Sequence, residues 1–302
     1  MNLQKNIIQT IIYYDILDFP LTSFEIWKNL IGERKCSLGE ITETLESSEL
    51  ENRIEEYNGF YFLHGRKELV AWRIQADKDA GLKFEIAEKA AKWLRFAPYV
   101  RMVALTGTLA MKNCEKDSDI DFFVVLEKGR IFTGRLLATA MTHVLGRRRY
   151  GKKVKNRICL NYFVATDSLK IERQDLFAAN EYTFVFLLFS GSAGRDFYRA
   201  NFDWIKKFKP NWEIPELAPA RYHVDPTSIS RFAQKALERL INSLGGDRIE
   251  TWLKCVQIAR IGRNPLTRKD GAYVRANEKN LIFLPDPQGV RIEKEWQKRI
   301  KS

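Results

Sequence analysis

Two apolar runs, joined by a glycine turn and a polar loop, place the strongest constraint on how this chain can fold. Residues 100–106 (VRMVALT) and 119–126 (DIDFFVVL) are typical of buried strands, and Gly107 and Thr108 follow the first of them. The second run begins with Asp119 and Asp121. Side chains two apart in a strand point to the same face, so we expect these two carboxylates to lie side by side, with Ile120 and Phe122 opposite.

The negative charge of two such neighbouring acids must be compensated. Two adjacent carboxylates repel each other unless one is protonated or a cation lies between them, and Mg²⁺ prefers oxygen ligands of this kind together with phosphate oxygens. Glycine at the preceding turn permits close approach to the backbone, and a helix beginning there presents free N–H groups to an anion. We therefore interpret Gly107-Thr108 as a phosphate site that faces a metal site.

The segments around these runs alternate between helix and strand. Residues 82–96 have helical spacing and end before Pro98, and residues 131–146 form a second predicted helix. A basic segment, 147–157, leads to a third predicted strand at 158–165 (ICLNYFVA). Beyond Asp175 the pattern predicts mainly helix, and the final 40 residues lack a clear periodicity and are predicted to be irregular.

This pattern resembles the DNA polymerase β-like nucleotidyltransferase superfamily. The signature is an apolar residue, glycine and a small hydroxyl residue, followed after ten residues by two acids that alternate with apolar residues, and it extends here from Leu105 to Phe122. The resemblance covers residues 78–175 and implies an α+β fold with a small mixed sheet. It also implies Mg²⁺ and a nucleoside triphosphate donor, with ATP as the expected donor. It assigns phosphates to Gly107 and Thr108 and metal ions to Asp119 and Asp121.

The sequence offers further candidate site residues besides those that define this signature. Ser118 and Arg135 are candidates for nucleotide contact, although Arg135 could equally lie exposed. Active members of the superfamily carry a third carboxylate on the later strand, where this chain has Asn161. An amide can ligate weakly but cannot accept a proton at neutral pH. Asp167 and Glu172 are close enough in sequence to substitute.

Residues 1–75 resemble a winged-helix domain in the order of their elements. Thr22 with Glu25, and Ser37 with Glu40, predict two capping boxes, and Asn58-Gly59 predicts a two-residue hairpin turn. The helix that would enter a DNA groove carries acids, namely Glu40, Glu43 and Glu46. Phosphate contact requires Lys and Arg, so we expect docking or scaffolding rather than DNA binding.

Charge is concentrated in two blocks of a chain whose net charge is +12. Residues 128–173 hold 12 Lys and Arg against 2 Asp and Glu, and the C-terminal block is also basic. The segment 147–157 is either a solvated loop or a site for pyrophosphate or an RNA-like acceptor, and the sequence favours neither. The four cysteines lie far apart and are expected to be reduced and inert. No run is long enough to span a membrane and no signal peptide is evident, so we expect a cytoplasmic protein without a membrane partner.

The predicted organisation is a winged-helix-like domain (1–75), a nucleotidyltransferase core (78–175) and a helical C-terminal region with an irregular tail (176–302). The predicted function is Mg²⁺-dependent transfer of a nucleoside monophosphate to an acceptor hydroxyl on a small molecule, a protein or an RNA end. Two alternatives remain open. One is a catalytically inactive nucleotide-binding or regulatory module, and the other is a winged-helix regulator that binds DNA.

Overall fold

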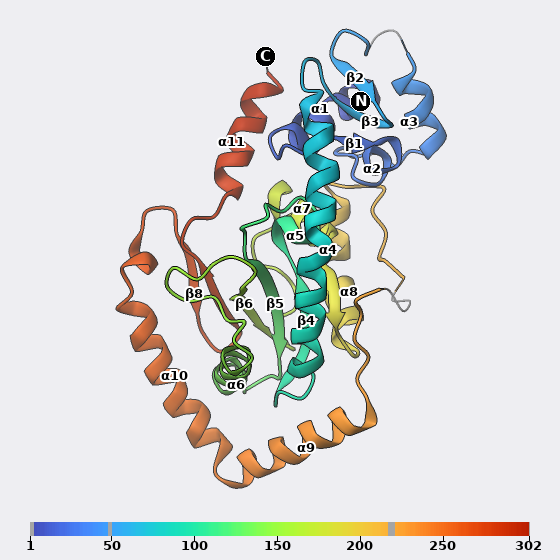
Figure 1. Ribbon diagram of the computed structural model, residues 1–302. Helices are drawn as coiled ribbons and strands as arrows, with labels where there is room; N and C mark the ends of the chain where they lie inside the picture. The colour runs from blue at the N-terminus through green and yellow to red at the C-terminus, as the bar shows by residue number, and fades with distance from the viewer. Residues whose placement is uncertain (1–2, 48–49, 217–220, 302) are drawn as a thin grey trace.

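A computed structural model describes residues 3–47, 50–216 and 221–301 and has a mixed α/β architecture (Figure 1). A small three-stranded sheet lies in the N-terminal part, and a six-stranded mixed sheet forms the centre. The helices are α1 (Leu3–Asp15), α2 (Ser23–Lys28), α3 (Leu38–Leu45), α4 (Glu68–Leu94), α5 (Gly107–Ala110), α6 (Ile131–Val144), α7 (Leu176–Thr183), α8 (Ala193–Lys206), α9 (Ser228–Ser243), α10 (Gly246–Gly262), the 3₁₀ helix η1 (Pro265–Arg268) and α11 (Gly289–Arg299).

The N-terminal part has its elements in the order α1, β1 (Leu21–Thr22), α2, α3, β2 (Ile54–Tyr57) and β3 (Phe60–Leu63). Both predicted capping boxes are confirmed, because Thr22 caps α2 and Ser37 caps α3 with reciprocal bonds to the glutamates three residues on. The predicted hairpin turn is also confirmed. Asn58 and Gly59 have φ angles of 54° and 79°, the left-handed conformation that a tight hairpin requires at both turn positions.

The central sheet has the strand order β7-β4-β5-β6-β9-β8. Three of its four inner strands are those that the sequence predicted: β4 (Val100–Leu105), β5 (Ile120–Leu126) and β6 (Ile158–Ala165). β4 and β5 run antiparallel, whereas β5 and β6 run parallel with α6 as the connection between them. This topology brings the end of β4 and the starts of β5 and β6 to the same edge of the sheet.

Helices cover both faces of the central sheet. On one face α4 and α6 pack against Ile120, Phe122 and Val124, as the expected alternation of β5 requires. On the other face α7 and α8 pack around Phe123 and Val125. A third core joins the N-terminal part to the rest of the chain, because Leu176 of α7 and Trp296 of α11 are buried among its isoleucines and tyrosines.

The C-terminal region differs from its prediction. The prediction of an irregular tail is wrong, because the last 40 residues contain β8 (Tyr273–Ala276), β9 (Asn280–Leu284) and α11. A further strand, β7 (Phe186–Phe189), interrupts the predicted helical region, and all three strands extend the central sheet. Helix α4 is longer than predicted and starts at Glu68, inside the predicted N-terminal domain. Among the described residues, no helix combines the length and apolar character needed to cross a bilayer.

Candidate functional site

The turn after β4 lies directly beside the acid pair. The antiparallel register pairs Leu105 with Phe122, so the residues that follow β4 meet those that begin β5. The backbone N–H of Thr106 donates to the carbonyl of Asp121 at 3.2 Å. Gly107 has a φ of +66°, and a Cβ placed on it would lie 3.1 Å from Oδ2 of Asp121. Both the backbone conformation and the neighbouring carboxylate therefore favour glycine here.

The two acids converge as the strand pattern predicted. One carboxylate oxygen of Asp119, one of Asp121 and the Sγ atom of Cys159 all lie within 4.8 Å of one another. Cys159 is there because β6 pairs it with Asp121 in the parallel register, which places both side chains on one face. No motif in the sequence distinguishes Cys159 from the other cysteines.

Burial and mutual repulsion perturb this cluster. Burial, and then the charge of Asp119, raise the pKa of Asp121 to about 7, and Arg149 offsets part of this effect. Burial and the two neighbouring acids also raise the pKa of the Cys159 thiol, which keeps the sulfur protonated at neutral pH. Burial and repulsion thus favour protonation of Asp121 near neutral pH when no cation is bound.

The basic segment 147–157 supplies one counter-charge. Nη1 of Arg149 forms an ion pair with Oδ2 of Asp119. A second pair, Lys155 with Asp117 at 2.6 Å, joins the same segment to the loop before β5, and both of its side chains are largely exposed. The segment is therefore held against the acidic loop at two points.

A bulge in β6 brings Asn161 into the site. The pairing of β5 with β6 skips one residue between Phe122 and Phe123, because Leu160 and Tyr162 are the partners on β6. The extra residue places two consecutive side chains on one face. Tyr162 packs on Phe123 with ring centroids 5.2 Å apart, and Asn161 donates from Nδ2 to Oδ1 of Asp121 at 2.8 Å. Asn161 thus reaches the acid pair as a hydrogen-bond donor.

Sequence reasoning missed a further carboxylate, Glu181 on α7. Burial, followed by the charge of Asp121, raises its pKa to about 7, and a hydrogen bond from the Gly107 backbone partly offsets the shift. Glu181 therefore lies against both halves of the predicted site. A signal was present in the sequence, since Glu181 is the single charged residue in the otherwise uncharged stretch 176–194.

The turn, Asp121, Asn161 and Glu181 open into one cavity of about 650 Å³, which Asp119 and Cys159 adjoin but do not line. Its lining combines the turn, Asp121, Asn161 and Glu181 with apolar side chains and with further charged residues. The lining includes Leu17, Trp72, Thr106, Gly107, Thr108, Met111, Ser118, Asp121, Asn161, Arg173, Phe177, Glu181, Tyr273, Leu284, Arg291 and Ile292. The structure therefore brings together Gly107, Thr108, Ser118, Asp121 and Asn161, all of which the sequence singled out.

Three other candidates lie elsewhere. Arg135 is buried between α6 and the C-terminal elements, where Nη1 donates to Gln257 at 2.7 Å, and burial lowers its pKa to about 10. Asp167 pairs with Lys128 at 3.3 Å after the far end of β6, roughly 20 Å of strand away from the acid pair. Glu172 accepts a hydrogen bond from Asn280 at 2.9 Å and does not line the cavity. These positions give none of the three direct access to the cavity.

The donor set fits a hard divalent cation. Asp119 and Asp121 converge closely enough to share an ion, and the neighbouring cavity leaves room for water or phosphate oxygens that would complete its coordination. The protonated thiol of Cys159 is a poor ligand for Mg²⁺, so the two carboxylates would hold the ion.

Comparisons with known proteins assign no function to this chain. The chain matches no protein-family model, and comparisons with curated proteins and with solved structures give no significant match.

Proposed function

We propose that this chain is a nucleotidyltransferase of the DNA polymerase β-like type, which transfers a nucleoside monophosphate from ATP or another nucleoside triphosphate to an acceptor hydroxyl. The observation that carries the proposal is the close approach of Gly107 to Asp121, with Asp119 converging on the same point. A phosphate bound at the turn would lie next to an ion held by the two acids, which is the arrangement that phosphoryl transfer requires.

Each residue has a defined task in this proposal. The backbone at Gly107 and the hydroxyl of Thr108 bind phosphate oxygens. Asp119 and Asp121 hold Mg²⁺, which when bound neutralises the charge that develops on the transferred phosphoryl group. Asn161 keeps Asp121 oriented and favours its ionised form through the 2.8 Å hydrogen bond.

Glu181 is our candidate for the carboxylate that Asn161 does not provide. It faces the same cavity, and a pKa of about 7 suits a group that accepts a proton from an acceptor hydroxyl near neutral pH. Its hydrogen bond with the Gly107 backbone has a second consequence, because a phosphate would compete with Glu181 for that backbone.

The size and lining of the cavity indicate the kind of acceptor that it could bind. Its volume of about 650 Å³ lies in the range of sites for small molecules, and its apolar lining residues, such as Phe177 and Leu284, suit a partly apolar compound. A small-molecule acceptor is therefore favoured over a protein side chain or an RNA end.

A second candidate function is a catalytically inactive nucleotide-binding module. Asn161 at the position of the third carboxylate and the occupation of the Gly107 backbone by Glu181 both support it. In that case the chain would bind nucleotide and report its presence without turnover.

For residues 1–75 we propose a winged-helix-like docking module. The order α1, β1, α2, α3, β2, β3 supports the winged-helix assignment. Glu40, Glu43 and Glu46 are all exposed on or next to α3, so this helix would repel DNA phosphates.

Calorimetric titration with ATP and a non-hydrolysable analogue, with and without Mg²⁺, tests nucleotide binding. Pyrophosphate release over a panel of acceptors tests turnover. Asp121→Asn should abolish Mg²⁺-dependent binding and release, whereas Asp117→Asn, which removes an exposed acid four residues away, should leave both unchanged. Binding without release would select the inactive module. Equal behaviour of the two variants would contradict both functions.

A further inference from the structure

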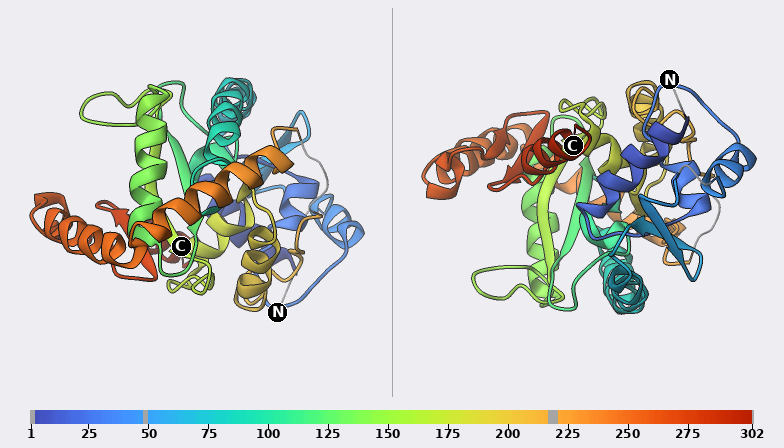
Figure 2. Two further views of the ribbon diagram at one scale, coloured as in Figure 1. Left: turned by 90° about the horizontal axis from the view of Figure 1, so that it is seen from below. Right: turned by 90° about the horizontal axis from the view of Figure 1, so that it is seen from above.

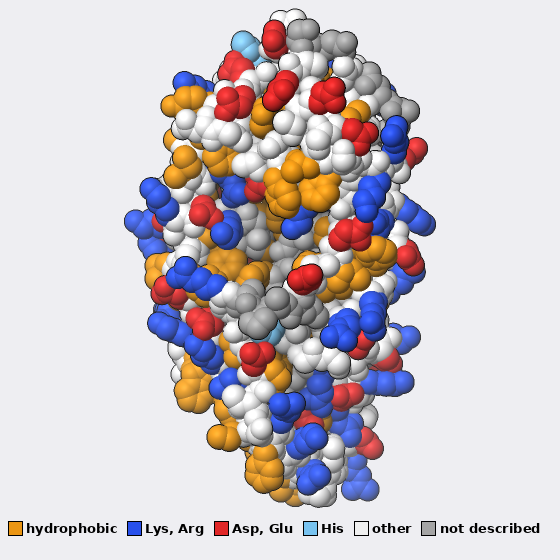
Figure 3. All heavy atoms as spheres, turned by 90° about the vertical axis from the view of Figure 1, so that its right-hand side faces the viewer, with side chains coloured by type: hydrophobic (Ala, Val, Ile, Leu, Met, Phe, Trp, Pro, Cys, Tyr) orange, Lys and Arg blue, Asp and Glu red, His pale blue; other side chains and the backbone are white. Residues whose placement is uncertain are grey.

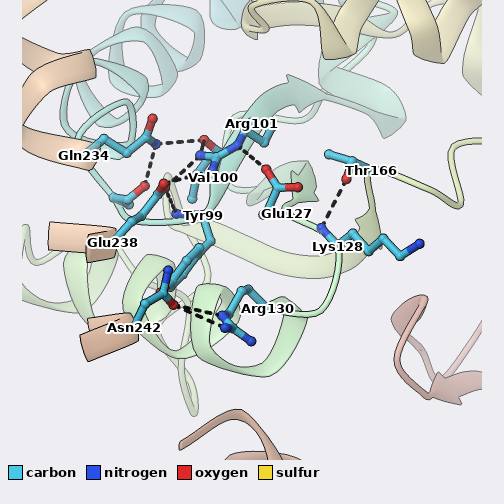
Figure 4. Close-up of polar contacts among 11 residues, drawn as sticks. Tyr99, Val100, Arg101, Glu127, Lys128, Arg130, Thr166, Gln234, Glu238 and Asn242 are labelled. Carbon is cyan, nitrogen blue, oxygen red and sulfur yellow. Dashed lines mark hydrogen bonds and ion pairs between the residues drawn. The ribbon is translucent and has the colours of Figure 1, made fainter. Parts of the chain in front are cut away.

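Helix α9 packs on the rest of the protein through polar side chains. Nε2 of Gln234 donates to the carbonyls of Ala97 and Val100 at 2.8 and 2.9 Å, and Glu238 binds Arg101 through both carboxylate oxygens at 2.8 and 3.1 Å (Figure 4). These contacts lie four residues apart on one face of the helix.

The third contact of the series is one turn further on. Asn242 accepts hydrogen bonds from the Tyr99 hydroxyl at 2.9 Å and from Nη2 of Arg130 at 3.2 Å (Figure 4). The face of α9 that meets the core is therefore polar at three successive turns, which reverses the usual orientation of an amphipathic helix.

The apolar face of α9 points away from the core. Ile229, Phe232, Leu240 and, just beyond the helix, Leu244 are 74, 75, 55 and 69% exposed. At about 100° per residue these positions lie on the side opposite Gln234 and Glu238. Figure 2 shows α9 lying across the lower end of the molecule, so its outer face is open to a partner.

Basic side chains predominate around this apolar face. Residues 228–269 contain nine Lys and Arg against three Asp and Glu. Arg231, Lys235 and Arg239 form an exposed row along one flank of the apolar stripe. Figure 3 shows hydrophobic side chains beside Lys and Arg at this lower end of the molecule.

Each acid of this segment has a partner on the body of the protein, although the Asp247 side chain stays 90% exposed. Glu238 pairs with Arg101, Asp247 pairs with Arg130 at 2.7 Å, and Glu250 accepts hydrogen bonds from the backbone N–H groups of Phe132 and Thr133 at 2.9 Å. Because Glu238, the single acid on α9, is engaged with the core, the outer surface of this helix is both apolar and basic.

Three kinds of partner can be compared on these grounds. A second copy of the chain would bring two rows of like charge together, which disfavours self-association through this face. A nucleic acid would satisfy the row of Lys and Arg but would leave Ile229 and Leu240 without an apolar environment. A bilayer with anionic headgroups satisfies both, since its interface offers phosphates and acyl chains at adjacent depths.

We propose that the outer face of α9 binds the surface of an anionic phospholipid bilayer. The apolar stripe enters the interface between headgroups and acyl chains, and the flanking row contacts lipid phosphates. Trp252 and Val256 on the next helix, α10, are also exposed, at 64 and 45%. The sequence predicts no membrane partner because it holds no spanning segment, and a helix that lies on the surface needs none.

Co-sedimentation of the full chain with vesicles tests the proposal. The protein should bind vesicles that mix phosphatidylcholine with phosphatidylglycerol, and should bind phosphatidylcholine alone much more weakly. Phe232→Ser should weaken binding about tenfold, as expected for one large apolar side chain. Lys235→Ala should weaken it about fivefold, as expected for one basic residue near an anionic surface.

Matched controls keep the test decisive. Leu82→Ser removes a leucine on α4 that is 58% exposed, and it should bind vesicles as the unaltered chain does. Because Phe232 is 75% exposed, Phe232→Ser should keep the circular dichroism spectrum and melting temperature of the unaltered chain. The proposal is overturned if mixed vesicles do not bind, if Leu82→Ser weakens binding as much as Phe232→Ser, or if RNA binds this face while vesicles do not. A dimer that Phe232→Ser dissociates would also overturn it in favour of self-association.

Discussion

Asn161 donates a hydrogen bond from Nδ2 to Oδ1 of Asp121, across the parallel pair β5 and β6, at 2.8 Å. Asn161 therefore places a neutral hydrogen-bond donor beside the two acids. A carboxylate at this position would instead add to the repulsion between Asp119 and Asp121. The amide therefore stabilises the two acids when no cation is present, and a carboxylate at this position would depend on the cation.

Asn161→Asp tests this dependence. Without metal, the added acid should lower the melting temperature at neutral pH because three carboxylates repel one another. With Mg²⁺, it should bind the ion about tenfold more tightly, because an added charged oxygen ligand strengthens such sites. Thermal denaturation in EDTA and in Mg²⁺ measures both effects. Asp117→Asn should change neither, and an Asn161→Asp variant that Mg²⁺ stabilises no more than the unaltered chain would contradict a metal site here.

Gly107→Ala should combine backbone strain with a local contact. The positive φ costs an L residue about 1–2 kcal/mol, and the new Cβ would lie 3.1 Å from Oδ2 of Asp121. We expect a loss of that size in the free energy of unfolding, together with loss of nucleotide binding. Chemical denaturation and calorimetric titration measure the two quantities.

Gly59→Ala is the matched control for this change. Gly59 has a φ of +79°, and no described atom lies within 4 Å of a Cβ placed there. The variant should show a similar loss of stability with unchanged nucleotide binding. If both variants bind nucleotide normally, Gly107 has no place in a phosphate site.

Local patterns were sufficient to predict the centre of the fold and half of the site. Apolar runs identified β4, β5 and β6, and the spacing of Asp119 and Asp121 indicated a shared face, which the structure confirms. The approach of Gly107 to Asp121 follows from the antiparallel pairing of the strands that carry them. These features depend on residues close in sequence, whose preferences act in the same direction.

The remaining features depend on contacts between distant segments. Strands β7, β8 and β9 have four or five residues each, too short to show a period, and β9 is defined by its pairing with β6 more than 100 residues earlier. The bulge that turns Asn161 toward Asp121 is a property of strand register, which the sequence of one strand does not specify. Glu181 comes to Gly107 only through the packing of α7 on the sheet.

Arg149→Ala should strengthen metal binding. Arg149 pairs with Asp119, so it competes with a divalent cation for the same carboxylate. Removing an ion pair whose arginine is 43% exposed should cost the metal-free protein about 1 kcal/mol or less and should tighten Mg²⁺ binding by up to about fivefold. Calorimetric titration with Mg²⁺ measures the change.

Lys155→Ala controls for general loss of positive charge. Lys155 lies in the same basic segment but pairs with Asp117, outside the converging cluster. The Lys155→Ala variant should have the same Mg²⁺ affinity as the unaltered chain. Weaker Mg²⁺ binding in Arg149→Ala would mean that the arginine supports the site instead of competing for it.

The acid pair predicts a pH dependence of stability in the metal-free protein. The folded-state pKa of Asp121 is about 7, above its ordinary value of 3.8. The folded state therefore binds the proton more tightly than the unfolded state does. The contribution of Asp121 to stability is present in full below about pH 4 and is lost as the pH rises toward about 7. Asp121→Asn should remove this loss, so its stability relative to the unaltered chain should rise between these pH values.

Asp117→Asn provides a control of opposite sign. A hydrogen bond from Lys155 lowers the pKa of Asp117 below its ordinary value, so its contribution to stability is lost as the pH falls. Denaturant titrations in EDTA across this pH range separate the two variants. A flat difference between Asp121→Asn and the unaltered chain would contradict the raised pKa of Asp121.

Glu181→Gln should separate binding from turnover. The change keeps the shape of the side chain but removes a negative charge that lies against Gly107 and Asp121, so repulsion of the triphosphate falls and ATP should bind more tightly. An amide cannot accept the proton of an acceptor hydroxyl, so pyrophosphate release should fall by about 10²-fold or more. Glu172→Gln is the control, because Glu172 binds Asn280 outside the cavity and should affect neither quantity. If Glu172→Gln stops release and Glu181→Gln does not, the third carboxylate is Glu172 and our assignment of Glu181 is wrong.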